Sequence, residues 1–246
     1  MTLQIIQADQ VAPQAWRNGG GQTRELLVWP ISAIATQKAS AGNGSQSVSL
    51  GGNALCSVSP ARCAGSSFTC AEPIATQTPS APSRQPGWQL RISRADIEAS
   101  GPFSAFPGVQ RWFVVLSGKG VVLHMPSGDH TLLPGDAPLH FDGGLAPGCT
   151  LIDGPTQDLN LMVRGGSACV LPVQSGIAWD AQFSQRGLYT ACSGTWSDGH
   201  QTQSVAAHTL LWLPEANPNT APMRFFSDEA KQPQAWWLGF TPEPAA

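Results

Sequence analysis

Apolar and polar residues alternate over residues 88–93, the period of a half-buried β-strand. One face of this predicted strand is apolar and the other polar; the two sets are Trp88, Leu90, Ile92 and Gln89, Arg91, Ser93. The same pattern returns at 158–164, where Leu159, Leu161 and Val163 face one way and Asp158, Asn160, Met162 and Arg164 the other. We therefore expect two strands that each present a row of polar side chains opposite a core face.

Further short β-prone segments cover most of the remaining chain. Residues 109–116 and 121–125 read as a hairpin around the turn at 117–120, and residues 23–29 as an earlier strand. Other strands are predicted near 131–136, 138–141, 150–153, 169–173, 187–193, 208–213, 223–226 and 235–240. Short strands at close spacing without a βαβ pattern favour an all-β fold of antiparallel barrels or sandwiches. The simplest division is one small barrel over 1–165 and a second over 166–246.

The segment from 36 to 87 has a different composition. Between Thr36 and Gly87 the charged residues are Lys38, Arg62, Glu72 and Arg84, while Ser, Ala, Gly, Pro and Gln dominate. Low charge and low aromatic content predict a long insertion with little regular structure, tethered between two strands.

Overall composition narrows the function classes. The formal net charge of −3 is spread over 246 residues without a basic stripe, which argues against a nucleic-acid surface. No run approaches the roughly 18 apolar residues of a membrane span, and the start MTLQIIQADQ lacks a signal-peptide pattern. We expect a cytoplasmic protein whose six cysteines are reduced thiols.

Arg111 raises the central chemical question. It shares a strand face with Phe113 and Val115, and an unpaired buried guanidinium is expensive. Either an internal carboxylate, Asp158 or Glu25, or a bound anion could be its partner. From the residues alone the two readings are equally favoured, because the interiors of small barrels often hold ligands.

Catalytic motifs are absent from the sequence. There is no GxSxG, no HExxH and no pair of histidines one residue apart, and the five histidines are scattered. His124 and His140 are the best candidates for a metal pair, on neighbouring predicted strands. They define the alternative function, a metal-dependent isomerase or dioxygenase acting on a small organic acid.

Four ordered segments carry a family resemblance. They are Trp16-Arg17-Asn18-Gly19-Gly20-Gly21-Gln22-Thr23-Arg24-Glu25, Trp88-Gln89-Leu90-Arg91-Ile92-Ser93, Gly101-Pro102-Phe103-Ser104-Ala105-Phe106-Pro107-Gly108-Val109-Gln110-Arg111 and Asp158-Leu159-Asn160-Leu161-Met162. Together they resemble the signature blocks of the HutD/Ves family, whose members are bicupins. The chain departs from that family by its long insertion, which could cover the barrel mouth or mediate assembly, for instance of a homodimer.

The resemblance implies two cupin-type barrels and a link to histidine utilisation. It also implies a role in sensing or buffering a small acidic intermediate such as formylglutamate or formiminoglutamate. The metal-binding motif of metal-dependent cupins, two histidines one residue apart followed by glutamate, does not occur here. We therefore expect a non-metal bicupin without a cofactor or catalytic residues, which binds a small carboxylate metabolite in a regulatory role.

The expected ligand site gathers residues from these blocks. Arg111 is the leading carboxylate anchor, because a guanidinium fork matches carboxylate geometry, and Arg91 or Arg24 is the second cation. Asn18, Ser93 and Asn160 are expected to form hydrogen bonds, and Phe103 and Phe106 to form apolar walls.

Overall fold

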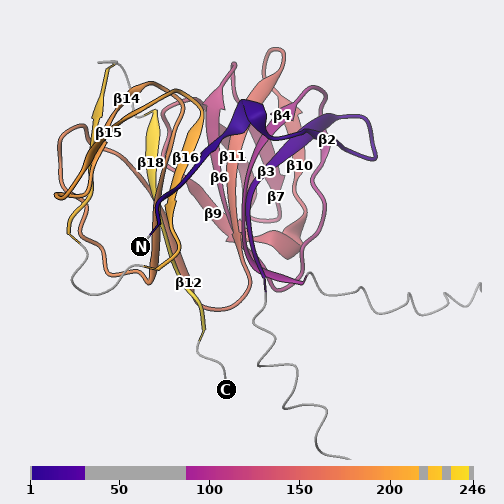
Figure 1. The fold of residues 1–246 in the computed structure, drawn as a ribbon. Coiled ribbons are helices and arrows are strands. Elements are labelled where there is room, and N and C mark those ends of the chain that lie inside the picture. The colour runs from indigo at the N-terminus through magenta and orange to yellow at the C-terminus, as the bar shows by residue number, and fades with distance from the viewer. Residues whose placement is uncertain (1, 31–86, 216–220, 229–233, 244–246) are drawn as a thin grey trace, which may run out of the picture. The chain divides into compact units, whose positions relative to one another are not determined.

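The computed structural model describes residues 2–30, 87–215, 221–228 and 234–243 (Figure 1). These residues form β-strands and two short 3-10 helices, η1 (Ala8–Gln10) and η2 (Gly143–Leu145). The prediction of an all-β fold is confirmed. Within the described ranges no helix has the length and hydropathy of a membrane span. The predicted insertion at 36–87 lies outside the described residues except for Gly87.

Two antiparallel sheets make up what we call the N-terminal half. The six-stranded sheet has the order β2 (Gln14–Ala15), β3 (Gly21–Pro30), β4 (Trp88–Ile97), β11 (Thr156–Val163), β6 (Gln110–Ser117) and β9 (Leu139–Asp142). The four-stranded sheet has the order β5 (Gly101–Pro102), β10 (Gly148–Leu151), β7 (Val121–Met125) and β8 (Gly128–Leu132).

Two further sheets make up the C-terminal half. The five-stranded sheet has the order β1 (Gln4–Gln7), β16 (Thr209–Leu213), β13 (Gln185–Thr190), β18 (Ala235–Thr241) and β12 (Ser167–Pro172). The three-stranded sheet has the order β15 (Thr202–Val205), β14 (Gly194–Ser197) and β17 (Arg224–Ser227).

The first strand of the chain belongs to the C-terminal half. β1 pairs antiparallel with β16, so that Gln4 faces Trp212 and Gln7 faces Thr209 (Figure 1). The predicted boundary near Gly165 falls in the turn between β11 and β12, but the β1 pairing crosses it. The division into two domains at this position stays a prediction.

Three buried clusters occupy the spaces between these sheets. The predicted apolar faces of β4 and β11 pack against residues of the five-stranded sheet, including Trp212, Trp236 and Leu238. The opposite face of the six-stranded sheet packs Ile97, Phe113 and Val115 against Val121, Leu123 and Leu132 of the four-stranded sheet. The third cluster fills the C-terminal half. Alternation therefore gives the central strands of the six-stranded sheet, β4, β11 and β6, two different buried environments.

The predicted strands agree with the structure in position more than in length. The strand predicted at 88–93 extends to Ile97, and the one at 158–164 is Thr156–Val163. The strand predicted to run into a turn over 131–136 is the end of β8, which stops at Leu132, and the turn follows it. Strands β1, β2, β14 and β15 were not predicted; their segments are short or rich in polar residues.

Candidate functional site

A cavity of about 480 Å³ lies on the inner face of the six-stranded sheet. Its floor comes from the neighbouring strands β4, β11 and β6. Cross-strand pairing places residues of the three strands in rows. The rows are Ala95–Asp158–Val115, Ser93–Asn160–Phe113 and Arg91–Met162–Arg111. A register shift between Gln157 and Asp158 marks a bulge where β11 meets β6. Polar residues at alternate positions of β4 and β11 therefore meet in one place.

A hydrogen-bonded chain runs across this floor. The Nε and Nη2 groups of Arg111 donate to Oδ1 of Asn160 at 2.8 Å and 2.6 Å. The amide Nδ2 of Asn160 in turn donates to Oδ1 of Asp158. One amide thus holds the guanidinium and the carboxylate apart, and Arg111 does not form the direct pair with Asp158 or Glu25 that we considered from the sequence.

Aromatic rings surround the guanidinium of Arg111. Its central carbon lies 4.4 Å from the ring centre of Phe103, 5.5 Å from that of Phe141 and 5.8 Å from that of Phe113. Burial lowers the pKa of Arg111 to about 10, with Asp158 acting in the opposite direction. The group stays cationic at neutral pH, and ring faces favour a cation over a neutral group.

Burial also shifts the pKa of the Asp158 carboxyl, but upward. It is 1% exposed, and burial raises its pKa to about 7, although the charge of Arg111 and the hydrogen bond from Asn160 act to lower it. Nearby, Cys149 is also buried, which raises the pKa of its thiol to about 12. The thiol is therefore an apolar packing group rather than a nucleophile.

Two more guanidinium groups line the cavity. Nε of Arg91 lies 2.7 Å from Oε1 of Glu25 on the adjacent strand β3, an ion pair that leaves the other nitrogens of Arg91 without a partner among the described residues. Arg17 also lines the cavity, from the exposed turn between β2 and β3. Three cations thus converge on a space where Asp158 and the paired Glu25 are the nearby acids.

The turn before β3 forms one wall. Nε1 of Trp16 donates to Oγ1 of Thr23 at 2.7 Å, and the side chain of Asn18 accepts from the amide of Gly20 at 3.1 Å. Gly21 has φ +157°, and a Cβ there would collide with the carbonyl oxygen of Asp96. The glycine-rich sequence is therefore required for the close approach of this turn to β4.

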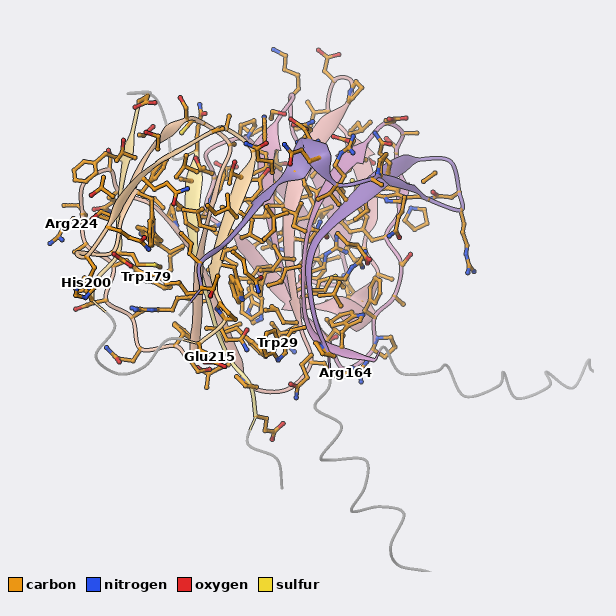
Figure 2. All side chains as sticks on the ribbon, viewed as in Figure 1. Trp29, Arg164, Trp179, His200, Glu215 and Arg224 are labelled. Carbon is orange, nitrogen blue, oxygen red and sulfur yellow. The ribbon has the colours of Figure 1, made fainter. Side chains whose placement is uncertain are left out.

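The segment after β5 forms the other wall. The amide of Phe103 donates to the carbonyl of Pro147 at 2.9 Å, and that of Phe106 to the carbonyl of Gly143 at 2.8 Å. Nη2 of Arg164, labelled in Figure 2, donates to the carbonyl of Pro107 at 2.8 Å. These main-chain contacts fix the two phenylalanine rings beside the polar floor.

The structure brings together most of the residues predicted from the sequence. Seven of the eight line the cavity: Asn18, Arg91, Ser93, Phe103, Phe106, Arg111 and Asn160. Arg24 does not, because it lies on the opposite face of β3 and its Nη1 donates to the carbonyl of Val11 at 2.6 Å. Arg24 lies two residues before the buried Leu26, and residues two apart on a strand point to the same face. This spacing was the sequence signal that would have excluded Arg24 from the cavity.

Other lining residues were not predicted as ligand contacts. Arg17 and Met162 stand inside the quoted blocks but received no role, and Asp158 was considered only as a partner for Arg111. The pairing of β11 between β4 and β6 is what moves Asp158 into the cavity, and this order cannot be obtained from one strand's periodicity.

The histidines of the alternative metal site do not reach the cavity. His124 bonds Asp129 through Nδ1 and Thr150 through Nε2, each at 2.8 Å, on the four-stranded sheet. His140 belongs to the six-stranded sheet and stacks on Trp112 with ring centres 4.2 Å apart. Over the ranges that the structure describes, no group of three or more His, Cys, Asp or Glu side chains could hold a metal ion.

The sequence places the chain in a family. The HutD family model matches residues 70–223, and the chain belongs to the HutD family. Protein Ves of Citrobacter koseri is 30% identical over 154 residues, 53% of this chain and 80% of its own length. An uncharacterized 21.2 kDa protein in the hutC 3' region of Pseudomonas putida is 46% identical over 79 residues, but that match spans 31% of this chain and only 39% of the relative.

Solved structures share the fold at low identity. HutD from Pseudomonas fluorescens SBW25 has a TM-score of 0.66 at 20% identity, covering 98% of both chains. A conserved protein of unknown function from Pseudomonas aeruginosa PAO1 has a TM-score of 0.66 at 22% identity, covering 98% of this chain and 100% of the other. The resemblance predicted from the four sequence blocks is therefore confirmed.

Proposed function

We propose that this chain binds a small carboxylate metabolite in the cavity of the N-terminal half, in a regulatory role linked to histidine utilisation. The carrying observation is the convergence of Arg17, Arg91 and Arg111 on one space of about 480 Å³. Like charges repel when water is displaced, so a bound anion is the group that stabilises this arrangement. The volume suits a metabolite rather than a polymer.

The free donors support a dicarboxylate. Nη1 of Arg111 has no hydrogen-bond partner among the described residues, and neither does the hydroxyl of the buried Ser93. Arg111 and Arg91 stand on either side of Met162, separated by two strand spacings of the sheet. Two carboxylates of one small molecule would each meet a guanidinium, with Phe103 and Phe106 covering the carbon chain.

The regulatory role and the cellular setting draw on the relatives. One relative is named for its place in the hutC 3' region, and the family resemblance carries formylglutamate and formiminoglutamate as candidate ligands. The described cysteines Cys149, Cys169 and Cys192 are free thiols, which suits a reducing cytoplasm. We further propose that each half is a cupin-type barrel, since each contains two antiparallel sheets around a buried cluster.

Calorimetry with formylglutamate, glutamate and succinate tests the ligand class. Arg111→Lys keeps the charge but loses the bidentate fork, so affinity should fall by roughly one to two decades. The matched control is Arg94→Lys. Arg94 is a buried guanidinium of β4 that faces the other way and pairs with Asp9 at 2.8 Å.

Melting curves separate binding from folding in both variants. Arg94→Lys should lower the melting temperature and leave affinity unchanged, whereas Arg111→Lys should change both. A wild type that binds none of the three acids refutes the proposal. A lower melting temperature with unchanged affinity in Arg111→Lys would make Arg111 a structural residue only.

A further inference from the structure

Asp158 lines the cavity, and one of its carboxylate oxygens has no partner among the residues that the structure describes. Oδ1 accepts the hydrogen bond from Asn160, while Oδ2 makes no hydrogen bond or ion pair with any residue that the structure describes. The residue lines the cavity although it is almost wholly buried. A buried carboxylate oxygen without a donor costs free energy, so this atom is available for a group that the ligand brings.

The position of this oxygen relative to Arg111 determines which group of the ligand can reach it. The amide of Asn160 contacts the guanidinium through Oδ1 and the carboxylate through Nδ2. The guanidinium of Arg111 and the carboxylate of Asp158 therefore lie on the same cavity floor, with the side-chain amide of Asn160 between them. A ligand carboxylate on Arg111 brings its neighbouring atoms toward Asp158.

We infer that Asp158 is a specificity-determining residue, which selects small carboxylates that carry an N–H donor beside the anchored carboxylate, as an α-amino acid or its N-substituted form does. This inference rests on the proposed function. A ligand with an N–H satisfies the free oxygen, whereas an analogue with a methylene there leaves it desolvated and unpaired. Sites built to accept a donor discriminate strongly against analogues that lack it.

Charged and titratable groups around Asp158 make its protonation state the controlling variable. Arg111 on β6, Arg91 and Asp96 on β4, and Cys149 on β10 act on the Asp158–Arg111 pair, and Glu25 on β3 pairs with Arg91. None of the five histidines lines the cavity. Because the pKa of Asp158 is about 7, the carboxylate accepts an N–H above that pH and carries its own proton below it.

The test compares glutamate with glutarate, which has the same carbon chain without the ammonium group. By calorimetry at about pH 8, wild type should bind glutamate at least about tenfold more tightly than glutarate, the scale of one charge-assisted hydrogen bond. In Asp158→Asn the ratio should fall close to one, with glutarate binding retained. The control Asp96→Asn changes a carboxylate bonded by Gln22 and Gln157 outside the cavity, and should keep the wild-type ratio.

Wild type alone provides a second arm, which decides the question if Asp158→Asn fails to fold. At about pH 5.5 Asp158 is protonated, and the glutamate preference should largely disappear once glutarate affinity is corrected for the partly protonated second carboxyl of that acid. Equal affinities at pH 8, or a preference that persists in Asp158→Asn or at pH 5.5, overturns the inference and leaves carboxylate binding intact. Failure of both ligands and of formylglutamate to bind overturns the proposed function itself.

Discussion

The two halves of the molecule fill their interiors differently. In the C-terminal half the space between the five- and three-stranded sheets holds Trp179, Trp196, Trp237 and Phe225. Trp179, labelled in Figure 2, stacks on Trp237 with ring centres 5.3 Å apart. In the N-terminal half the corresponding space holds aliphatic and phenylalanine side chains together with the polar cavity.

The contrast lies in the residues at alternate positions of the strands. Where β18 and β16 direct Trp237, Leu211 and Leu213 inward, β4 and β11 direct Arg91, Ser93 and Asn160 inward. One half gains stability from buried apolar area, and the other gives part of it up for groups that can bind an anion. Under the proposed function, stability and recognition are assigned to different halves of one chain.

The largest expected effect comes from emptying the filled half. Trp196 is 0% exposed, so Trp196→Ala should lower the free energy of unfolding by about 3–5 kcal/mol, as large-to-small changes in cores do. Glutamate affinity of the folded fraction should not change. Urea unfolding and calorimetry measure the two quantities; a variant that loses affinity while remaining folded would show that the halves are not independent in this way.

The second effect is a pH dependence confined to the cavity half. Asp158 has a pKa of about 7 when folded against an ordinary value of 3.8, so its contribution to stability is complete below about 3.8 and is lost as the pH rises through 7. At about 1.4 kcal/mol for each pH unit between the folded and the ordinary pKa, the loss of unfolding free energy amounts to a few kcal/mol. Asp158→Asn removes the contribution.

Urea unfolding of wild type and Asp158→Asn at several values between about pH 4 and pH 7 measures this difference. We expect wild type to lose stability relative to Asp158→Asn as the pH rises. Parallel curves over the whole range would show that the carboxyl does not carry a raised pKa. Trp196→Ala serves as the control, because it should follow the pH dependence of wild type.

A smaller effect is expected from the connection between β3 and β4. Pro30 and Trp88 are register partners at the end of an antiparallel pair, so a short turn can join them without moving either strand. Replacing residues 36–87 with a short Gly/Ser linker should change stability by no more than about 1 kcal/mol, since loop-closure entropy varies slowly with length. Melting curves and glutamate calorimetry provide the check, and a variant that does not fold would show that the segment contributes to the core.

The smallest effect is expected at the two histidines outside the cavity. Replacing both His124 and His140 by alanine should leave carboxylate affinity unchanged and stability within about 1 kcal/mol, since His124 makes only exposed polar contacts. Affinity should also survive extensive dialysis against a chelator. Loss of binding in either experiment, with restoration by zinc, iron, manganese or nickel, would favour the metal-dependent alternative.

Periodicity predicted the parts of the site that depend on a single strand. Most of the polar face of residues 88–93 and of that of 158–164 lines the cavity, except for Gln89 and Arg164, and the opposite faces enter the shared core. Arg111 with Phe113 and Val115 was placed correctly for the same reason. Successive side chains of a strand point to opposite faces of the sheet, so the sequence alone determines which side chains share a face. A register shift of one residue would move the whole apolar set to the opposite face, which a strand with one buried face does not tolerate.

Features that depend on neighbouring strands were beyond this kind of prediction. Nothing in residues 156–163 alone places Asp158 beside Ala95 and Val115, or directs Arg111 to Asn160 rather than to a carboxylate. Arg24 was named as an alternative second cation without a strand face, because its neighbours Thr23 and Glu25 are also polar. Short strands such as β14 and β15 acquire their conformation from pairing with each other and with β17.

The exchange of β1 into the C-terminal half has a consequence for biosynthesis. Residues 4–7 leave the ribosome roughly 200 residues before their partners in β16, residues 209–212. The nascent segment must therefore keep its backbone donors and acceptors available to water or chaperones until then, and closing so distant a pair slows folding.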